Sequence, residues 1–396
     1  GQGIYIKFLS KALADAGHEV DVISGPPYPE LDSRVKLIRL PSLNLFATDN
    51  HIMALRPRHL LSYTDLYEWL SMATGGFAEP YTFGRRLERY FQTHRPAYDI
   101  VHDNQSLSYG TLALQRLGLP LVTTIHHPIT SDLDIALKQA DSWRLRLLIR
   151  RWHSFLGMQK KVARQLDHLV TVSAASRQDI ASAFNLDPAR IQIIHNGIDT
   201  NVFTPNEGDT GEPDTIMTTA SADAPLKGLG YLLAAFARLK QSRPGLRLLL
   251  LGKLKKDGDT EKLIDSLGIR ADIEFHSSLA SEEVAALYRR AQVAVVPSIY
   301  EGFGLPAGEA MACGLPVIAT NGGALPEVVG DAGILVPVRD QEAIAKALAR
   351  LLDSPAERRD LATAARQRIL EHFSWDLAAR KMTGLYHDIA KQSLAA

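Results

Sequence analysis

An apolar strand, a glycine-rich turn and a helix start follow one another in the stretch Val293-Ala294-Val295-Val296-Pro297-Ser298-Ile299-Tyr300-Glu301-Gly302-Phe303-Gly304-Leu305-Pro306-Ala307-Gly308-Glu309. The continuous apolar run predicts a strand buried in a parallel sheet. Pro306 suits a first helical turn, where its missing N–H breaks no hydrogen bond. The turn predicts free backbone N–H groups at a helix N-terminus, a site for phosphate or sugar oxygens. The alternative is a tight turn whose carboxylates are solvated or cap the helix.

Segments of strand and helix character alternate on both sides of this stretch. The sequence predicts strands at 19–24, 35–40, 99–102, 121–125, 168–172, 192–194, 215–220, 247–251, 272–276, 293–296, 316–319 and 333–336. It predicts helices at 4–16, 228–241, 281–290, 306–313, 341–352, 356–372 and 375–391. Such alternation is typical of α/β folds with parallel sheets. We expect two Rossmann-like halves, with a ligand bound in the cleft between them.

Three segments define the expected domain organisation. Residues 41–80 have no clear period and many aromatics, which predicts a long irregular insertion. Residues 206–213 are polar, acidic and contain glycine, which predicts a linker between domains 1–205 and 206–372, followed by a C-terminal helix at 373–396. The first residues, Gly1-Gln2-Gly3, form a glycine-rich turn without an initial Met. Because such a turn normally follows a strand, we expect that strand to be missing through truncation or an omitted start.

The composition excludes several classes of protein. Hydrophobic residues make up 46% of the 396 residues, and 44 Lys and Arg balance 44 Asp and Glu. Zero net charge argues against a nucleic-acid binder. Cys313 is the single cysteine, so an intramolecular disulfide is impossible, and a reducing cytoplasm fits. We see neither a signal peptide nor an apolar run long enough to span a bilayer.

The two glutamates of the opening stretch carry a family resemblance. Glu301 and Glu309, with seven residues between them, resemble the E-x7-E motif of retaining glycosyltransferase family 4, whose fold is GT-B. The resemblance continues through 310–320, 322–329, His195-Asn196-Gly197-Ile198-Asp199, Lys227-Gly228 and Phe373-Ser374-Trp375. It implies a hexosyltransferase that moves a sugar from a UDP- or GDP-sugar to a hydroxyl acceptor, with a final helix that crosses back to the first domain.

The resemblance also implies residue roles. Lys227 looks like the lysine that holds the donor diphosphate, and Glu309 resembles the carboxylate that binds the ribose diol. Glu301, His126 and Lys227 are the expected catalytic residues, with Glu301 and His126 facing the transferred sugar. The remaining expected donor contacts are Gly3, Asn196, Gly302, Phe303, Gly304 and Leu305. The resemblance also implies that no metal is needed for catalysis. No cofactor is expected, because the nucleotide sugar is a co-substrate.

The sequence departs from the family pattern at one position. Relatives often carry an arginine five residues before the lysine, where this chain has Ala222. Since stabilisation of the leaving group is a large catalytic contribution, another cation or a helix N-terminus must compensate. Lys253, Lys255 and Lys256 are candidates, although an ordinary solvated turn is the alternative.

Other signals support different functions. Gly1, Gly3 and Asp21 partly match a nicotinamide-binding fingerprint, but Ile6 occupies the place of its third small residue. Asp132-Leu133-Asp134 superficially resembles a metal-binding DxD, and its setting favours a loop or a helix cap; His127 is expected to be a packing or loop residue. A glycoside phosphorylase or hydrolase using Glu301 and Glu309, and a catalytically silent GT-B nucleotide-binding module, remain open.

A basic stretch predicts a second kind of contact. Residues 143–166 contain seven Arg or Lys and no acidic residue, interleaved with leucines and aromatics. Such a helix can lie on an anionic membrane surface, and the alternative is a domain helix with solvated cations. We therefore expect a cytoplasmic protein that either is free in the cytoplasm or contacts the inner face of the membrane. Its acceptor is unknown.

Overall fold

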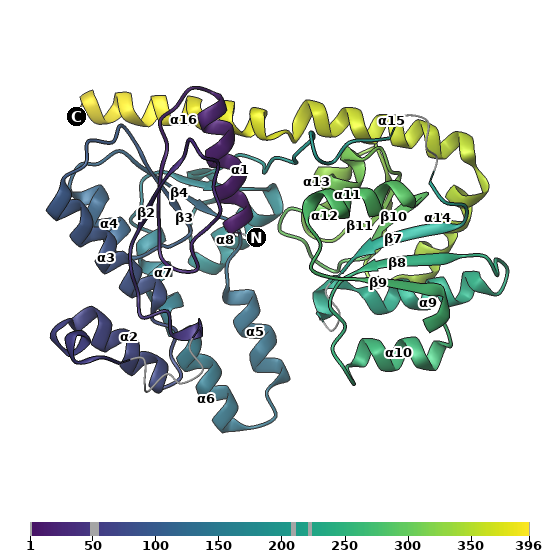
Figure 1. The fold of residues 1–396 in the computed structure, drawn as a ribbon, viewed down its shortest axis with the longest axis horizontal. Helices are drawn as coiled ribbons and strands as arrows, with labels where there is room; N and C mark the ends of the chain where they lie inside the picture. The colour runs from purple at the N-terminus through teal and green to yellow at the C-terminus, as the bar shows by residue number, and fades with distance from the viewer. Residues whose placement is uncertain (1, 48–54, 207–210, 221–223, 396) are drawn as a thin grey trace. The chain divides into compact units, whose positions relative to one another are not determined.

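The computed structural model describes residues 2–47, 55–206, 211–220 and 224–395. The chain divides into two compact units, which are described separately. Unit 1 comprises Gly1–Val172, Ser176–Ile194 and Ala379–Ala396, and unit 2 comprises Ser173–Ala175 and His195–Ala378. Figure 1 shows the helices and strands of each unit. Both units have parallel sheets, so the predicted α/β class is confirmed.

Unit 2 contains one parallel sheet with the strand order β12-β11-β10-β7-β8-β9. Its strands are β7 (Thr215–Thr219), β8 (Arg247–Leu251), β9 (Ile273–His276), β10 (Val293–Val296), β11 (Val317–Thr320) and β12 (Ile334–Val336). Each predicted strand of this unit lies within one residue of the observed bounds. The chain moves outward from β7 in one direction and from β10 in the other. The carboxyl ends of these two neighbours therefore form the switch point at which such sheets bind ligands.

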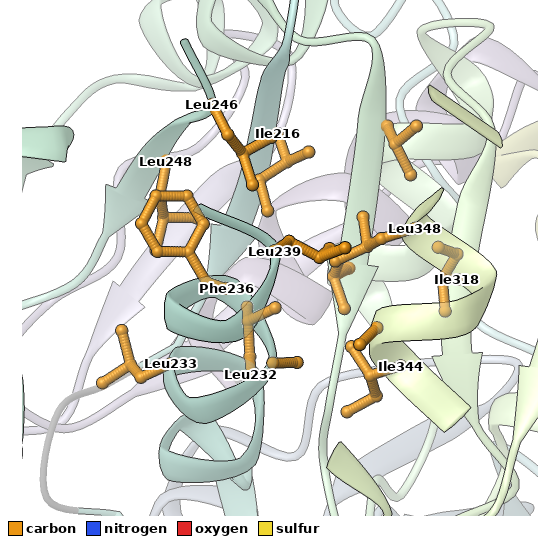
Figure 2. Packing of buried hydrophobic residues seen from close by; sticks show 14 of the residues in the cluster. Ile216, Leu232, Leu233, Phe236, Leu239, Leu246, Leu248, Ile318, Ile344 and Leu348 are labelled. Atoms are coloured by element: carbon orange, nitrogen blue, oxygen red, sulfur yellow. The ribbon is translucent and has the colours of Figure 1, made fainter. Parts of the chain in front are cut away.

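Helices connect these strands and cover the sheet. They are α9 (Leu229–Lys240), α10 (Asp259–Leu267), α11 (Ser281–Arg290), α12 (Leu305–Ala312), α13 (Leu325–Val329), α14 (Gln341–Asp353) and α15 (Pro355–His372). Apolar side chains of α9 and α14 pack against strands β7, β8 and β11 in the core that Figure 2 shows. Phe236, Leu232 and Leu348 in this core are fully buried. The buried core fixes the strands, and hence the loops at their carboxyl ends.

Unit 1 contains two separate parallel sheets. One has the order β3-β4-β5-β6 and the other pairs β1 with β2. The strands are β1 (Asp21–Ser24), β2 (Lys36–Arg39), β3 (Val101–Asn104), β4 (Leu121–Ile125), β5 (Leu169–Thr171) and β6 (Ile191–Ile193). Its helices include α1 (Gln2–Asp15), α3 (Glu79–His94), α4 (Tyr109–Arg116), α5 (Thr130–Gln139) and α8 (Ala174–Phe184).

The prediction of an irregular segment at 41–80 is wrong. The described part contains the short helices η1 (Leu45–Ala47) and η2 (Pro57–Leu61) and the α-helix α2 (Tyr63–Ala73). The buried positions of α2 are Glu68 and Ser71, so its inward face lacks the apolar period that identifies a helix in sequence. Arg86 of α3 pairs with Glu68 at 2.6 Å, which compensates the buried carboxylate.

The basic stretch 143–166 forms two helices of different environment. In α7 (Leu156–Ala163) Met158, Gln159 and Val162 are buried, as the domain-helix alternative predicts. In α6 (Trp143–Trp152) no residue is buried. The short helix η3 (His153–Phe155) joins them. Only α6 therefore retains the exposed basic and apolar character that a surface contact requires.

The C-terminal helix α16 (Trp375–Ala395) begins in unit 2 and continues in unit 1. Within unit 1, the Thr383 hydroxyl lies 2.9 Å from Nε2 of His18, and the Tyr386 hydroxyl lies 2.6 Å from Nδ1 of His102. The predicted return of the final helix to the first half of the chain is confirmed.

Candidate active site

The loops after β7 and β10 bring Lys227 and Glu301 together. Nζ of Lys227 lies 2.7 Å from Oε1 of Glu301, and the Ser298 hydroxyl donates to the same oxygen at 2.7 Å. The Glu301 side chain is 11% exposed and that of Lys227 is 31% exposed. The side chain of Lys227 is therefore partly exposed, and two donors orient the carboxylate of Glu301. The sequence analysis did not identify Ser298 as a site residue. Its position three residues before Glu301 is the one feature of the sequence that could have suggested this contact.

Backbone contacts between the loops fix this geometry. Ile299 N–H donates to the Leu226 carbonyl at 2.8 Å, directly beside Lys227. Gly228 has a φ of 61° and lies so close to the Pro297 carbonyl that a Cβ would overlap with it. Gly323, with a φ of 60°, lies equally close to the Glu301 carbonyl. Both positions require glycine, because other residues disfavour this φ and lack the space.

Glu309 lies one turn into α12 and has a perturbed pKa. Burial raises the pKa of this carboxyl to about 7, and a hydrogen bond from Tyr288 partly offsets the effect. The Tyr288 hydroxyl also contacts Thr219 Oγ1 at 3.0 Å and the Pro306 carbonyl at 3.2 Å. A half-buried carboxylate of this kind can accept hydrogen bonds from a diol. Tyr288 is a second residue that sequence analysis missed, because nothing distinguishes it within its helix.

The glycine-rich turn contributes mainly backbone. The Gly302 carbonyl accepts from the Ser173 hydroxyl at 2.6 Å, and Gly304 has a φ of 98° just before α12. The Phe303 ring is 5% exposed and packs edge-on against Phe373, with ring centroids 5.9 Å apart. Among the hydrogen bonds of the described residues, Ala307 and Gly308 N–H engage the Gly304 carbonyl, whereas Leu305 N–H engages none. Of these three backbone N–H groups at the N-terminus of α12, only that of Leu305 is therefore free for a ligand, fewer than the sequence predicted.

Asn196 and His195 lie beside the same turn. Asn196 is 8% exposed, and its Oδ1 has no hydrogen-bond partner among the described residues. His195 Nε2 lies 2.6 Å from Oε1 of Glu327, whose other oxygen accepts from Ala174 N–H at 2.8 Å. These contacts anchor the segment that carries Asn196.

His126 follows the end of β4 in unit 1. Its Nε2 lies 2.7 Å from Oδ1 of Asn104, and its N–H donates to Oε1 of Gln105 at 2.7 Å. The Tyr5 ring meets the imidazole edge-on at 4.6 Å between centroids. Burial, aided by His127 and His102, lowers the pKa of His126 to about 3. The imidazole is therefore neutral at physiological pH.

The remaining candidates fall in different places. Gly3 lies in the first turn of α1, and Ala222 lies outside the described residues. Lys253 is exposed on the loop after β8, and the preceding Gly252 packs against the Ala220 carbonyl at the end of β7. Lys255 and Lys256 are exposed on the same loop.

Two alternative signals have structural explanations. Asp132 and Asp134 lie within α5, Asp132 in its first turn, where a carboxylate favours the helix dipole. Nε2 of His127 is 3.7 Å from Asp132. Asp21 accepts from the Tyr98 hydroxyl at 2.7 Å. The described ranges contain no group of three or more potential metal ligands and no helix long and apolar enough to span a bilayer.

Comparison with known proteins identifies the class. The family model described as Glycosyltransferase Family 4 matches residues 1–202, and the model Glycosyl transferases group 1 matches residues 204–368. The MMP alpha-(1->4)-mannosyltransferase of Mycolicibacterium hassiacum is 46% identical over 390 residues, covering 98% of this chain and 94% of the relative.

Solved structures show the same fold. Sucrose-phosphate synthase from Thermosynechococcus elongatus superposes with a TM-score of 0.72 and 27% identity, covering 98% of this chain and 93% of the other. Anabaena HepE, solved with UDP-glucose, has a TM-score of 0.70 at 16% identity, and the match covers 98% of this chain and 96% of the HepE chain. The fold and the family models define a GT-B glycosyltransferase. The chain belongs to glycosyltransferase family 4, the retaining hexosyltransferases of group 1.

Proposed function

We propose that this enzyme transfers an α-mannosyl residue from a nucleoside-diphosphate mannose to a hydroxyl of a mannoside acceptor, forming an α-(1→4) bond. The observation that carries this proposal is the 46% identity to an alpha-(1->4)-mannosyltransferase along nearly the whole chain. The donor site of unit 2 supports it with a phosphate-binding cation, a diol-binding carboxylate and a sugar-facing carboxylate.

Each site residue has a role in this reaction. Lys227 binds the donor diphosphate and stabilises the charge that develops as it leaves. Glu309 accepts hydrogen bonds from the ribose diol, and Glu301 accepts one from a sugar hydroxyl. His126, neutral and oriented by Asn104, contributes a further hydrogen bond to the sugar from unit 1. The proposed minor contacts are Asn196, Phe303 and the backbone of Gly3, Gly302, Gly304 and Leu305.

The chemistry breaks the bond between the anomeric carbon and the phosphate oxygen. The acceptor hydroxyl attacks the same face, so the configuration is retained, and its proton passes to the departing phosphate. Lys227 is the cation that assists this departure. Exclusion of water suppresses hydrolysis of the donor, which is the competing reaction.

The test is a matrix of donors and acceptors. GDP-mannose, UDP-glucose and ADP-glucose are each supplied with 4-linked α-mannobiose or α-maltose as acceptor, and products are identified by NMR. We expect transfer from GDP-mannose alone, onto the mannoside alone. Transfer from UDP-glucose to maltose would refute the mannosyl assignment. Nucleotide binding without any transfer would support a silent binding module instead.

We further propose that α6 rests on an anionic membrane surface at the cytoplasmic face. Trp143 is 71% exposed and Leu147 is 60% exposed, and three exposed arginines of the same helix, Arg144, Arg146 and Arg150, supply positive charge. Arg151 fixes the helix to α2 by donating to Thr74 Oγ1 at 3.0 Å. Exposed apolar side chains beside cations are the composition of an interfacial helix.

The membrane contact is tested by sedimentation with vesicles of phosphatidylglycerol or of phosphatidylcholine. We expect binding to the anionic vesicles only, and its loss in the variant Trp143→Ala with Leu147→Ser. The matched control is Leu370→Ser, which removes a leucine that is 47% exposed on α15. Equal binding to both kinds of vesicle would contradict the charge argument. Self-association lost in the α6 variant would assign the surface to a second copy of the chain.

A further inference from the structure

The Tyr288 hydroxyl is buried where three parts of unit 2 meet. Tyr288 belongs to α11 and is 1% exposed. Its hydroxyl lies 3.0 Å from Oγ1 of Thr219, at the end of β7, and 3.2 Å from the Pro306 carbonyl oxygen in the first turn of α12. It also forms a hydrogen bond with the carboxyl group of Glu309, one turn further along α12. One hydroxyl therefore links a central strand to the helix that carries the carboxyl group proposed to bind the ribose.

This hydroxyl has one proton and two possible acceptors for it. The Pro306 carbonyl can only accept, and so can an ionised Glu309 carboxylate. When Glu309 holds a proton, it can donate to the Tyr288 oxygen while Tyr288 donates to Pro306. When Glu309 is ionised, Tyr288 can donate to the carboxylate, and the Thr219 hydroxyl can donate to the Tyr288 oxygen. Both protonation states of Glu309 therefore have a hydrogen-bond partner in Tyr288.

The surroundings of Glu309 leave Tyr288 as the group that supports its charge. Burial raises the pKa of Glu309 to about 7, the bond from Tyr288 opposes this rise, and no charged side chain of the described residues is among the causes. Burial raises the pKa of the neighbouring Cys313 thiol to about 12, against the opposing charges of Arg289 and Arg366, so the thiol is neutral. Burial also raises the pKa of Tyr288 well above its ordinary value of 10.0. The Tyr288 hydroxyl therefore keeps its proton in neutral and mildly alkaline solution.

We propose that Tyr288 is a positioning residue for the donor nucleotide: its hydroxyl follows Glu309 from the protonated form of the free enzyme to the ionised form that binds the ribose diol. The ribose hydroxyls donate to the carboxylate and so favour its ionised form. Nucleotide binding then releases the Glu309 proton to solvent, and Tyr288 donates to the carboxylate as that proton leaves. The inference rests on the proposed ribose role of Glu309.

A pH dependence follows from this arrangement. Because the pKa of Glu309 is about 7, roughly half of the free enzyme carries this proton at pH 7. Nucleotide affinity should therefore rise between about pH 6 and pH 8, where Glu309 ionises, and level off above that range. Removing the Tyr288 hydroxyl takes away a bond that favours the ionised form and raises the pKa of Glu309 further. The rise in affinity then moves to higher pH.

The test is calorimetric titration of the parent and of Tyr288→Phe with GDP from about pH 6 to pH 9. If the lost bond makes ionisation of Glu309 about tenfold harder, GDP should bind about fivefold more weakly at pH 7 and less than about twofold more weakly at pH 9. Titrations in two buffers of different ionisation enthalpy give the protons released, which should increase in the variant by about 0.4 per GDP at pH 7. The terminal phosphate of GDP titrates at about pH 6 with both proteins and cancels in the comparison.

Two controls separate positioning from a general loss of structure. Tyr98→Phe removes another tyrosine hydroxyl that donates to a carboxylate, at 2.7 Å from Oδ2 of Asp21 in unit 1, and should leave GDP affinity unchanged at every pH. In the background Glu309→Gln, the added change Tyr288→Phe should alter GDP affinity by less than about threefold and equally at every pH, because the group that Tyr288 positions can no longer ionise.

Four results would overturn the proposal. They are an unchanged GDP affinity of Tyr288→Phe at pH 7, a loss of affinity that is the same at pH 7 and pH 9, and an equal loss in the Glu309→Gln background. The fourth needs no change at Tyr288: a parent whose GDP affinity depends on pH no more than that of Glu309→Gln. These binding curves require no acceptor, so failure of the mannosyl transfer shows separately, as a lack of mannoside product from an enzyme that still binds GDP.

Discussion

Replacing Glu309 by glutamine should raise stability and weaken nucleotide binding at the same time. Burial raises the pKa of this carboxyl from 4.5 to about 7. The difference, 7 minus 4.5, corresponds to roughly 3 kcal/mol by which the folded protein disfavours the charged form. Because the folded state holds its proton more tightly than the unfolded chain, the contribution to stability is present below pH 4.5 and is lost as the pH rises to about 7.

The variant Glu309→Gln cannot ionise, so it escapes this loss. We expect its free energy of unfolding to exceed that of the parent by up to about 3 kcal/mol at pH 8 and by little at pH 5. Hydrogen bonds to a charged acceptor contribute about 1.5–3 kcal/mol, so GDP should bind roughly ten- to a hundredfold more weakly. Urea unfolding at both pH values measures the first effect, and calorimetric titration measures the second.

The matched control is Glu282→Gln, which removes an exposed carboxylate from the first turn of α11. It should change neither GDP affinity nor the pH dependence of stability. A stability difference for Glu309→Gln that is the same at pH 5 and pH 8 would refute the burial argument. An unchanged affinity for GDP would remove Glu309 from the ribose site.

Three further substitutions test the supporting geometry. Lys227→Met should lower kcat by about 10²–10³-fold with the fold intact by circular dichroism, and near-normal turnover would exclude a phosphate role. Gly228→Ala should lower Tm measurably in a thermal melt, because its Cβ would overlap the Pro297 carbonyl at a positive φ; an unchanged Tm would show that the turn can relax. Arg86→Met should lower the free energy of unfolding, measured with urea, by about 3–5 kcal/mol, because the buried Glu68 carboxylate loses this ion pair. If the added change Glu68→Gln restores the free energy of unfolding, the buried charge is the cause.

The sequence predicted the strands well where they are buried on both faces. Val293–Val296 and Arg247–Leu251 have the predicted bounds, because an uninterrupted apolar run within a parallel sheet ends where the loop begins. Helix α2 was missed because its inward residues are Glu68 and Ser71, and a polar inward face carries no hydrophobic period. The charge that compensates Glu68 comes from α3, a contact that only the tertiary structure creates.

The sequence motifs predicted which residues belong to the candidate site, but they did not predict most of the contacts between those residues. Spacing placed Glu301 and Glu309 around one turn, and the structure brings Lys227 to 2.7 Å from Glu301. The sequence could not predict that Phe303 packs into an aromatic cluster, since a phenylalanine between glycines suits a ligand contact equally well. Nor could it predict Tyr288 beside Glu309, which depends on how α11 packs against α12.

The most direct test of the proposed function is NMR of the product formed from GDP-mannose and a 4-linked α-mannobiose acceptor. The proposal predicts a new α-configured anomeric signal, a correlation from its carbon to position 4 of the acceptor, and release of one GDP per sugar transferred. A β-configured product would contradict retention. GDP release with free mannose and no glycosidic product would contradict transfer, and a glucoside formed only from UDP-glucose would contradict the choice of sugar.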